Sequence, residues 1–145
     1  MKEFHFCSPL SKKAIYLEMK NSDVFVGDVT EDSFSVMVRH SFNGNNVLNP
    51  QINAVVGDKS NTTQVDIKVG LHRNDKIGFC IMALLHSGLI CYFIIRAVLE
   101  SSVEPIFPIF AVLIFDIIFT LHFSLTFNSN VRKAINKLKK VLGLK

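Results

Sequence analysis

The chain has 145 residues, a net charge of +4 and a mean hydropathy of +0.33, which is high for a soluble domain of this length. Six of its sixteen Lys and Arg residues lie between Arg132 and Lys145, with no acid among them, and they follow a long apolar segment. A basic cluster in this position is typical of contact with anionic lipid headgroups, and it argues against a nucleic-acid-binding protein.

The N-terminal residues predict one strand and one helix. Residues 2–7 alternate two phenylalanines with Glu and His, as in a half-buried strand. Ser8 and Pro9 then favour a helix start, because Ser caps exposed N–H groups and Pro suits the first helical position. We expect this helix to end near Lys20, with Leu10, Ala14 and Leu17 on one face.

Four more strands are predicted after this helix. Their ranges are 24–29, 33–39, 51–56 and 64–71, and the last has the clearest alternation of apolar and polar residues. The segments 31–32 and 57–61 have the composition of turns, and residues 40–49 that of a loop. This order predicts an α+β domain over residues 1–74, in which a small antiparallel sheet packs on one helix.

Two apolar segments follow, at about residues 77–98 and 105–127. Each is longer than the roughly 20 residues that a helix needs to cross the hydrocarbon of a bilayer. The short acidic linker between them requires an antiparallel arrangement, so residues 75–128 are predicted to form a transmembrane hairpin. Two buried helices of a soluble core are the alternative, but a domain of this size could hardly cover two helices that are apolar all round.

The basic residues predict the orientation of this hairpin. Arg73 and Lys76 precede the first span and the basic tail follows the second, whereas the linker carries two Glu residues. The positive-inside rule therefore places both termini in the cytoplasm and the hairpin in the cell membrane. The first seven residues contain no apolar run of signal-peptide length, so export by a cleaved signal is not expected.

Residues 129–145 are predicted to form an amphipathic basic C-terminal helix. Its apolar positions recur at helical spacing: Val131, Ala134, Ile135, Leu138, Val141 and Leu142. Its candidate ligands for lipid headgroups are Arg132, Lys133, Lys137, Lys139 and Lys140. Such a helix either lies in the membrane interface or packs against the cytoplasmic domain, and the pattern fits both arrangements.

Three ionisable residues within the spans are candidates for a functional or structural role. His86 and Asp116 both lie near the middle of their spans, so we expect them to face each other, or a neighbouring copy. A polar pair in hydrocarbon either relays protons or ions, or holds helices together. Arg96 lies one turn from the linker, where its side chain reaches outward toward Glu100.

No motif in the chain predicts catalysis, a metal or a cofactor. The sequence has no P-loop, no dinucleotide-binding glycine pattern, no nucleophile elbow and no zinc-protease motif. Its three cysteines, Cys7, Cys80 and Cys91, are scattered and form no CxxC pair, which argues against a zinc site and a disulfide framework. We therefore expect a protein that is not an enzyme.

Several short segments between Val24 and Lys140 resemble a family of small, uncharacterised membrane proteins of bacteria, mainly Firmicutes such as clostridia. The resemblance rests on residues 25–29, 32–34, 46–50 and 63–72, in that order before the hairpin. It implies an N-terminal mixed α/β domain, a two-helix membrane hairpin and a charged tail. The family's Arg and Gly in the middle segment are replaced here by Asn45 and Ala54, and no activity comes with the resemblance.

Three functions remain as alternatives. The first is a membrane-anchored cytoplasmic module that binds a protein or regulates a neighbouring membrane complex. The second is an oligomeric membrane-active or transport component, in which His86 and Asp116 line a path between copies. The third is a membrane-bound enzyme that uses the loop of residues 40–49. The predicted partners are thus anionic lipid headgroups and either a membrane protein or further copies of this chain.

Overall fold

The computed structural model describes residues 1–39, 48–59, 62–100 and 106–144. The chain divides into two compact units, and the first combines residues 1–72 with residues 127–145. The second unit consists of residues 73–126. The predicted loop at residues 40–49 falls mostly outside the described residues, as does Asn61.

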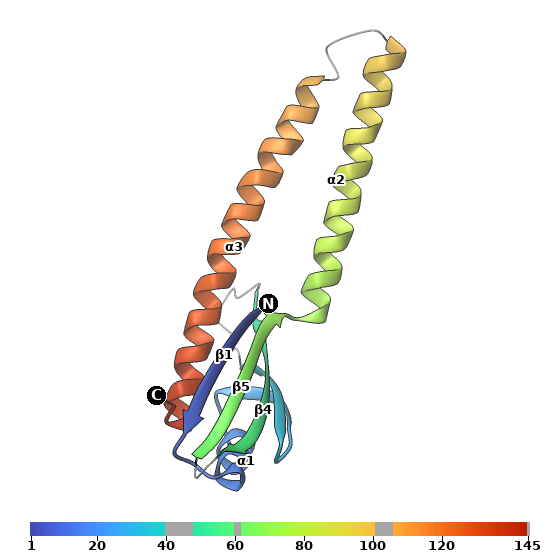
Figure 1. Cartoon of the computed structure of the whole chain (residues 1–145). Coiled ribbons are helices and arrows are strands. Elements are labelled where there is room, and N and C mark those ends of the chain that lie inside the picture. The colour runs from blue at the N-terminus through green and yellow to red at the C-terminus, as the bar shows by residue number, and fades with distance from the viewer. Residues whose placement is uncertain (40–47, 60–61, 101–105, 145) are drawn as a thin grey trace. The chain divides into compact units, whose positions relative to one another are not determined.

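The first unit is built on a five-stranded antiparallel sheet in the order β1-β5-β4-β3-β2 (Figure 1). The strands are β1 (Lys2–Ser8), β2 (Phe25–Val29), β3 (Ser33–Val38), β4 (Pro50–Lys59) and β5 (Thr62–Leu71). Each of the five overlaps a predicted strand, and the alternation that predicted them also gives their two faces. Phe34 and Val36 of β3 are buried on one face, as are Ile52 of β4 and Ile67 of β5.

The opposite face of the sheet is polar. In β1 and β5 the cross-strand pairs include an ion pair of Lys68 with Glu3 at 3.0 Å. On β3 and β4 the Ser35 hydroxyl donates to Asn53 at 2.7 Å and accepts from the Gln51 side chain at 2.9 Å. Such cross-strand pairs stabilise a solvated sheet face, so the apolar core lies on one side only.

The helix α1 (Lys12–Lys20) begins three residues later than its sequence predicts. The capping residue is Ser11, whose hydroxyl accepts a hydrogen bond from the Ala14 N–H at 3.3 Å. Ser8 is buried instead as the last residue of β1, where its hydroxyl donates to the Leu142 carbonyl at 3.3 Å. The buried residues of the helix are Ile15 and Met19, which are not among the three that were expected to share one face. Leu17 is 46% exposed.

The predicted turn at residues 57–61 was wrong for residues 57–59, which belong to β4, and residues 60–61 lie outside the described residues. Gly57 and Asp58 belong to β4 and pair with Gln64 and Thr63 of β5, so the two strands form a long antiparallel pair. Gly and Asp are uncommon inside strands, and their turn-forming tendency misled the prediction. The pairing of long neighbouring strands outweighs that local tendency.

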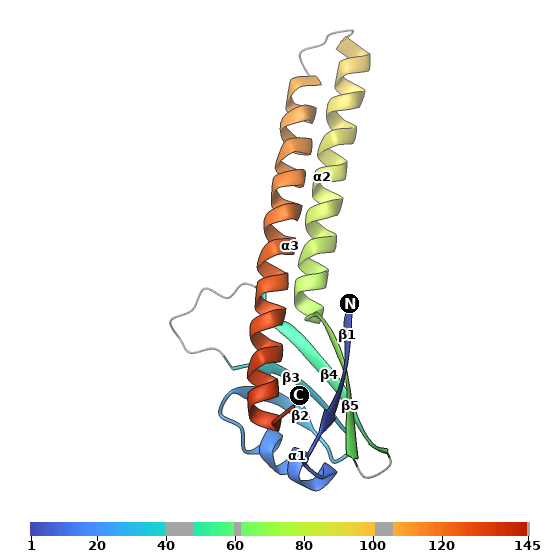
Figure 2. The same cartoon turned by 60° about the vertical axis from the view of Figure 1, so that its left-hand side comes forward.

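The basic C-terminal segment completes the core of the first unit. It is the end of α3 (Ile106–Leu142), and its buried residues are Val131, Ala134, Ile135, Leu138 and Leu142. They form one cluster with the apolar face of the sheet and with α1, and Figure 2 shows the end of α3 beside the sheet. Asn130 also donates to the Leu48 carbonyl at 2.9 Å. Of the two arrangements left open by the sequence, packing against the N-terminal domain is the one observed.

The second unit pairs α2 (Arg73–Glu100) with the first part of α3, and the two helices run side by side in Figures 1 and 2. Both helices are long and apolar enough to cross a membrane, with mean hydropathies of 2.1 and 2.3 in their most apolar stretches. No residue of α2 is buried. Large apolar side chains such as Leu84 and Ile117 are 73% and 62% exposed.

Replacement of Leu138 by Ala tests whether the tail is part of the core. Leu138 is fully buried, so we expect Leu138→Ala to lower the free energy of unfolding of the first unit by about 2–5 kcal/mol. Denaturant unfolding of the full chain in detergent, followed by near-UV circular dichroism, measures this change. Lys137→Ala is the control, because Lys137 is exposed on the same helix and should change stability little. Equal stability of the two variants would contradict the assignment of the tail to the core.

Candidate functional site

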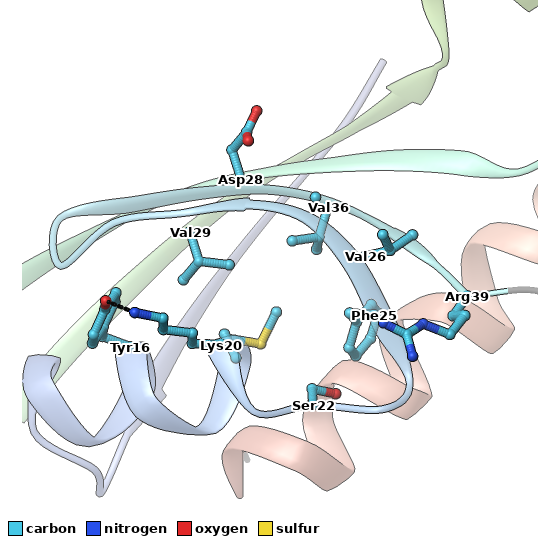
Figure 3. Close-up of a pocket in the computed structure, with 11 residues that line it drawn as sticks. Tyr16, Lys20, Ser22, Phe25, Val26, Asp28, Val29, Val36 and Arg39 are labelled. Atoms are coloured by element: carbon cyan, nitrogen blue, oxygen red, sulfur yellow. Dashed lines mark hydrogen bonds between the residues drawn. The ribbon is translucent and has the colours of Figure 1, made fainter.

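A groove of about 300 Å³ lies in the first unit between α1 and the edge of the sheet (Figure 3). Its apolar lining comes from Met19 of α1, Phe25 and Val29 of β2, and Val36 of β3. Its polar lining consists of Tyr16, Lys20, Ser22, Asp28 and Arg39. The groove therefore offers an apolar floor with hydroxyl groups and two cations around it.

The fold of α1 determines where its polar residues lie. Burial of Ile15 and Met19 fixes the helix against the sheet. Tyr16 and Lys20, four residues apart, then share the side that lines the groove. The Lys20 ammonium donates a hydrogen bond to the Tyr16 hydroxyl at 2.8 Å. This bond raises the pKa of Lys20 above its ordinary value, because it stabilises the charged form, so Lys20 is a cation at neutral pH.

Strand β2 forms the other wall of the groove. Gly27, in its middle, has a φ of +148°, which side-chain-bearing residues rarely adopt. A Cβ atom at this position would lie only 2.2 Å from the Ser35 carbonyl oxygen of β3. Glycine is thus required for β2 to approach β3 as closely as it does.

The two cations of the groove have no acidic partner in the part of the chain that the structure describes. No described carboxylate lies within 4.0 Å of the charged atoms of Lys20 or Arg39. Lys12, on the same helix, is by contrast paired with Asp32 at 3.1 Å and Asp58 at 3.6 Å. Figure 3 shows the side chain of Asp28 on the side of β2 that points away from the groove. The lining thus carries two cations and one acid, and the side chain of that acid, Asp28, lies away from both cations.

The structure brings His86 and Asp116 together in the second unit. The His86 Nδ1 and an Asp116 carboxylate oxygen are in hydrogen-bond contact, and both side chains are partly exposed. The Phe115 ring packs edge-on against the imidazole at 5.6 Å. A cavity of about 270 Å³ beside the pair is also lined by Ser87 and Thr120. The arrangement joins α2 to α3 through a polar contact within apolar surroundings.

The remaining predicted site residues are not gathered into one site. Arg96 donates to Glu100, one turn further along α2, at 2.7 Å. Arg132, Lys133, Lys137 and Lys140 are exposed, whereas Lys139 is partly buried and its ammonium lies 4.7 Å from the centroid of the Phe6 ring. Because the apolar side of the tail is covered by the sheet, these cations are not backed by an apolar face available to a membrane.

Sequence reasoning missed the groove and one exposed pair on the polar sheet face. His5 contacts Asp66 at 2.7 Å, because the two residues are directly opposite in β1 and β5. No spacing along the chain indicates this pair, since 61 residues separate its members. Among the described residues, no group of three or more His, Cys, Asp or Glu side chains is placed to hold a metal ion.

Comparisons with known proteins identify no relative: no family model, no curated protein and no solved structure matches the chain.

Substitution of Asp116 tests the polar contact between α2 and α3. We expect Asp116→Ala to weaken the pairing of the two helices by about 1 kcal/mol, the usual scale for hydrogen bonds between helices in apolar surroundings. Asp116→Asn keeps an oxygen acceptor for His86 and should retain most of the pairing. The chain for this measurement lacks Cys7 and Cys80 and carries one label on Cys91 of α2 and another on Leu113→Cys of α3. Energy transfer between the labels reports separation of the two helices, and the SDS concentration at half-separation is the midpoint. Identical midpoints for all three chains would show that the contact contributes nothing.

Proposed function

We propose that this protein is a membrane-anchored, non-enzymatic interaction module. In this proposal α2 and the first part of α3 span the cell membrane, and the first unit lies in the cytoplasm, where its groove binds a protein or regulates a neighbouring membrane complex. The observation that carries the proposal is the contrast between the two units. The first unit buries a complete apolar core, whereas α2 buries none of its apolar side chains.

The exposed apolar surface of the hairpin needs a covering, and a bilayer supplies one. Transfer of apolar surface from water contributes roughly 25 cal/mol per Å², and large apolar side chains are exposed along α2 and along the first part of α3. The distribution of Arg and Lys then favours an orientation with both termini in the cytoplasm. The same order of parts characterises the Firmicutes membrane-protein family that the sequence resembles, and we include membership of that family in the proposal.

The composition of the groove favours binding over catalysis. Cations and hydroxyl groups around an apolar floor recognise a partner through charge and shape. We further propose that the tail cations remain close enough to the membrane surface to attract anionic headgroups. No cofactor forms part of this proposal.

A second function, an oligomeric membrane-active or transport component, is supported by one observation. The His86–Asp116 contact and the adjoining cavity place two ionisable groups in the apolar unit. Ionisable residues inside membranes are costly and often belong to a proton or ion path. A single hairpin is too thin to enclose such a path, so this function requires several copies. We give it second place, because a hydrogen bond between the two helices explains the same contact.

Labelling of cysteines tests the proposed orientation. In a chain with Cys80→Ala and Cys91→Ala, the exposed Cys7 should react with a membrane-impermeant maleimide only after the cells are broken. The matched chain keeps Cys80→Ala and Cys91→Ala and adds Cys7→Ser and Leu99→Cys. In intact spheroplasts the same maleimide should react with the cysteine at the exposed position 99. Reaction of Cys7 in intact spheroplasts would reverse the proposed orientation.

Cross-linking in native membranes tests the proposed interaction. Mild cross-linking followed by purification of a tagged chain and mass spectrometry should yield one foreign protein in near-stoichiometric amount. Leu138→Ala, which disrupts the first unit but leaves the hairpin unchanged in sequence, should lose this partner while the chain stays in the membrane. A ladder of self-cross-links without a foreign protein would contradict the module and favour the oligomeric alternative.

A further inference from the structure

We propose that the groove binds an acidic, extended peptide segment of a protein partner, which adds to the sheet as a sixth strand beside β2. This inference rests on the proposed interaction function and names the partner's chemistry. Three independent properties of the groove carry it: the open backbone of β2, the shape of the space beside it, and its charge.

The backbone of β2 has one open side. The strand lies at the edge of the sheet and pairs only with β3 among the described strands. The Arg39 N–H donates to the Val24 carbonyl at 2.7 Å, and the Thr30 N–H donates to the Ser33 carbonyl at 2.8 Å. In an antiparallel pair the residues that bond to the neighbouring strand alternate along the chain. The even-numbered residues from Val24 to Thr30 therefore direct their backbone groups toward β3.

The intervening residues, Phe25, Gly27 and Val29, direct their N–H and C=O groups away from β3. These three residues also line the groove. A second extended chain placed there would satisfy the outward-pointing groups through main-chain hydrogen bonds, as in other complexes formed by strand addition. The groove thus lies beside the part of the edge that is able to hydrogen-bond a new strand.

The shape of the groove suits alternate side chains of such a strand. Its walls are α1 on one side and β2 on the other, and Met19, Phe25 and Val29 supply apolar contacts (Figure 3). Its volume of about 300 Å³ lies at the lower end of the range for ligand sites. Apolar side chains at every second position of an added strand would point toward this floor.

The charge of the groove selects the kind of peptide. Lys20 and Arg39 lie toward different ends of the groove in Figure 3, and no described carboxylate pairs with either. A segment with one carboxylate near each end of the groove, from Asp, Glu or the chain terminus, would neutralise both. Charge complementarity of this kind speeds association and discriminates between partners. The occupant is therefore an extended segment whose groove-facing side chains are apolar in the middle and acidic at the two ends.

A synthetic peptide tests this inference on the full chain in detergent micelles. The probe is a heptapeptide with Asp at positions 1 and 7, Val at positions 3 and 5, and Thr at positions 2, 4 and 6, so that its Asp and Val side chains share one face; it ends in a free carboxylate and is titrated to millimolar concentration. Nuclear magnetic resonance of the labelled protein should show larger amide shifts for Phe25, Gly27 and Val29 than for Val26 and Asp28. Methylation of the peptide nitrogens that face β2 should abolish binding, whereas methylation of those that face outward should leave it unchanged.

Two protein variants test the contribution of charge. Lys20→Gln combined with Arg39→Gln should weaken binding of the acidic probe by at least about tenfold, because charge-assisted hydrogen bonds are lost. Lys13→Gln is the matched control, since Lys13 is an exposed cation of α1 outside the groove. A probe with Asn in place of Asp, and an amidated end, should bind the wild-type chain and the double variant equally weakly.

The inference is overturned if the probe causes no shifts up to millimolar concentration, if the shifts lie away from β2, or if both methylated peptides bind alike. These outcomes are separate from the proposed function. A partner captured in membranes without peptide binding at β2 would leave the module intact and reject the strand-addition site. Peptide binding without any membrane partner would support the site and contradict the wider proposal.

Discussion

The sheet of the first unit has one apolar face, and the structure depends on covering it. A helix of nine residues, α1, is too short to do so alone. The end of α3 provides the rest of the cover through five buried residues and adds a hydrogen bond between its backbone and Ser8. Burial of these side chains also determines where the lysines of the tail lie. Once the apolar side of the tail faces the sheet, its cations are left in solvent.

The short length of α1 also explains why the groove exists. Because α1 covers only part of the apolar face, a space remains beside β2, and Met19 of α1 and Phe25 of β2 line it. The edge strand, the short helix and the two cations thus occur together for a structural reason. The hairpin, by contrast, has no comparable core, and its polar content is concentrated at His86 and Asp116.

The strands and apolar helices were predictable because each depends on local periodicity. Alternation along residues 64–71 required burial of one face, and the length of the apolar runs required long helices. The buried face of α1 was not predictable from so short a helix, in which Leu17 and Met19 are equally apolar candidates. The location of the tail was ambiguous for a different reason: a sheet and a bilayer both accept the same amphipathic pattern. The groove depends on residues that are brought together only by the fold, as Tyr16 and Arg39 are.

The participation of both chain ends in one core has a consequence for biosynthesis. Ser8 and Leu142, which share a hydrogen bond, are separated by 134 positions, and the whole hairpin lies between them. A ribosome releases the five strands before α3, so the apolar face of the sheet stays partly uncovered until residues 131–142 have been made. If the hairpin spans a membrane as proposed, its insertion precedes the packing of these residues against the sheet. A chain whose hairpin is misplaced would expose the apolar face of its sheet. Cellular quality control recognises such exposed apolar surfaces and degrades the proteins that carry them.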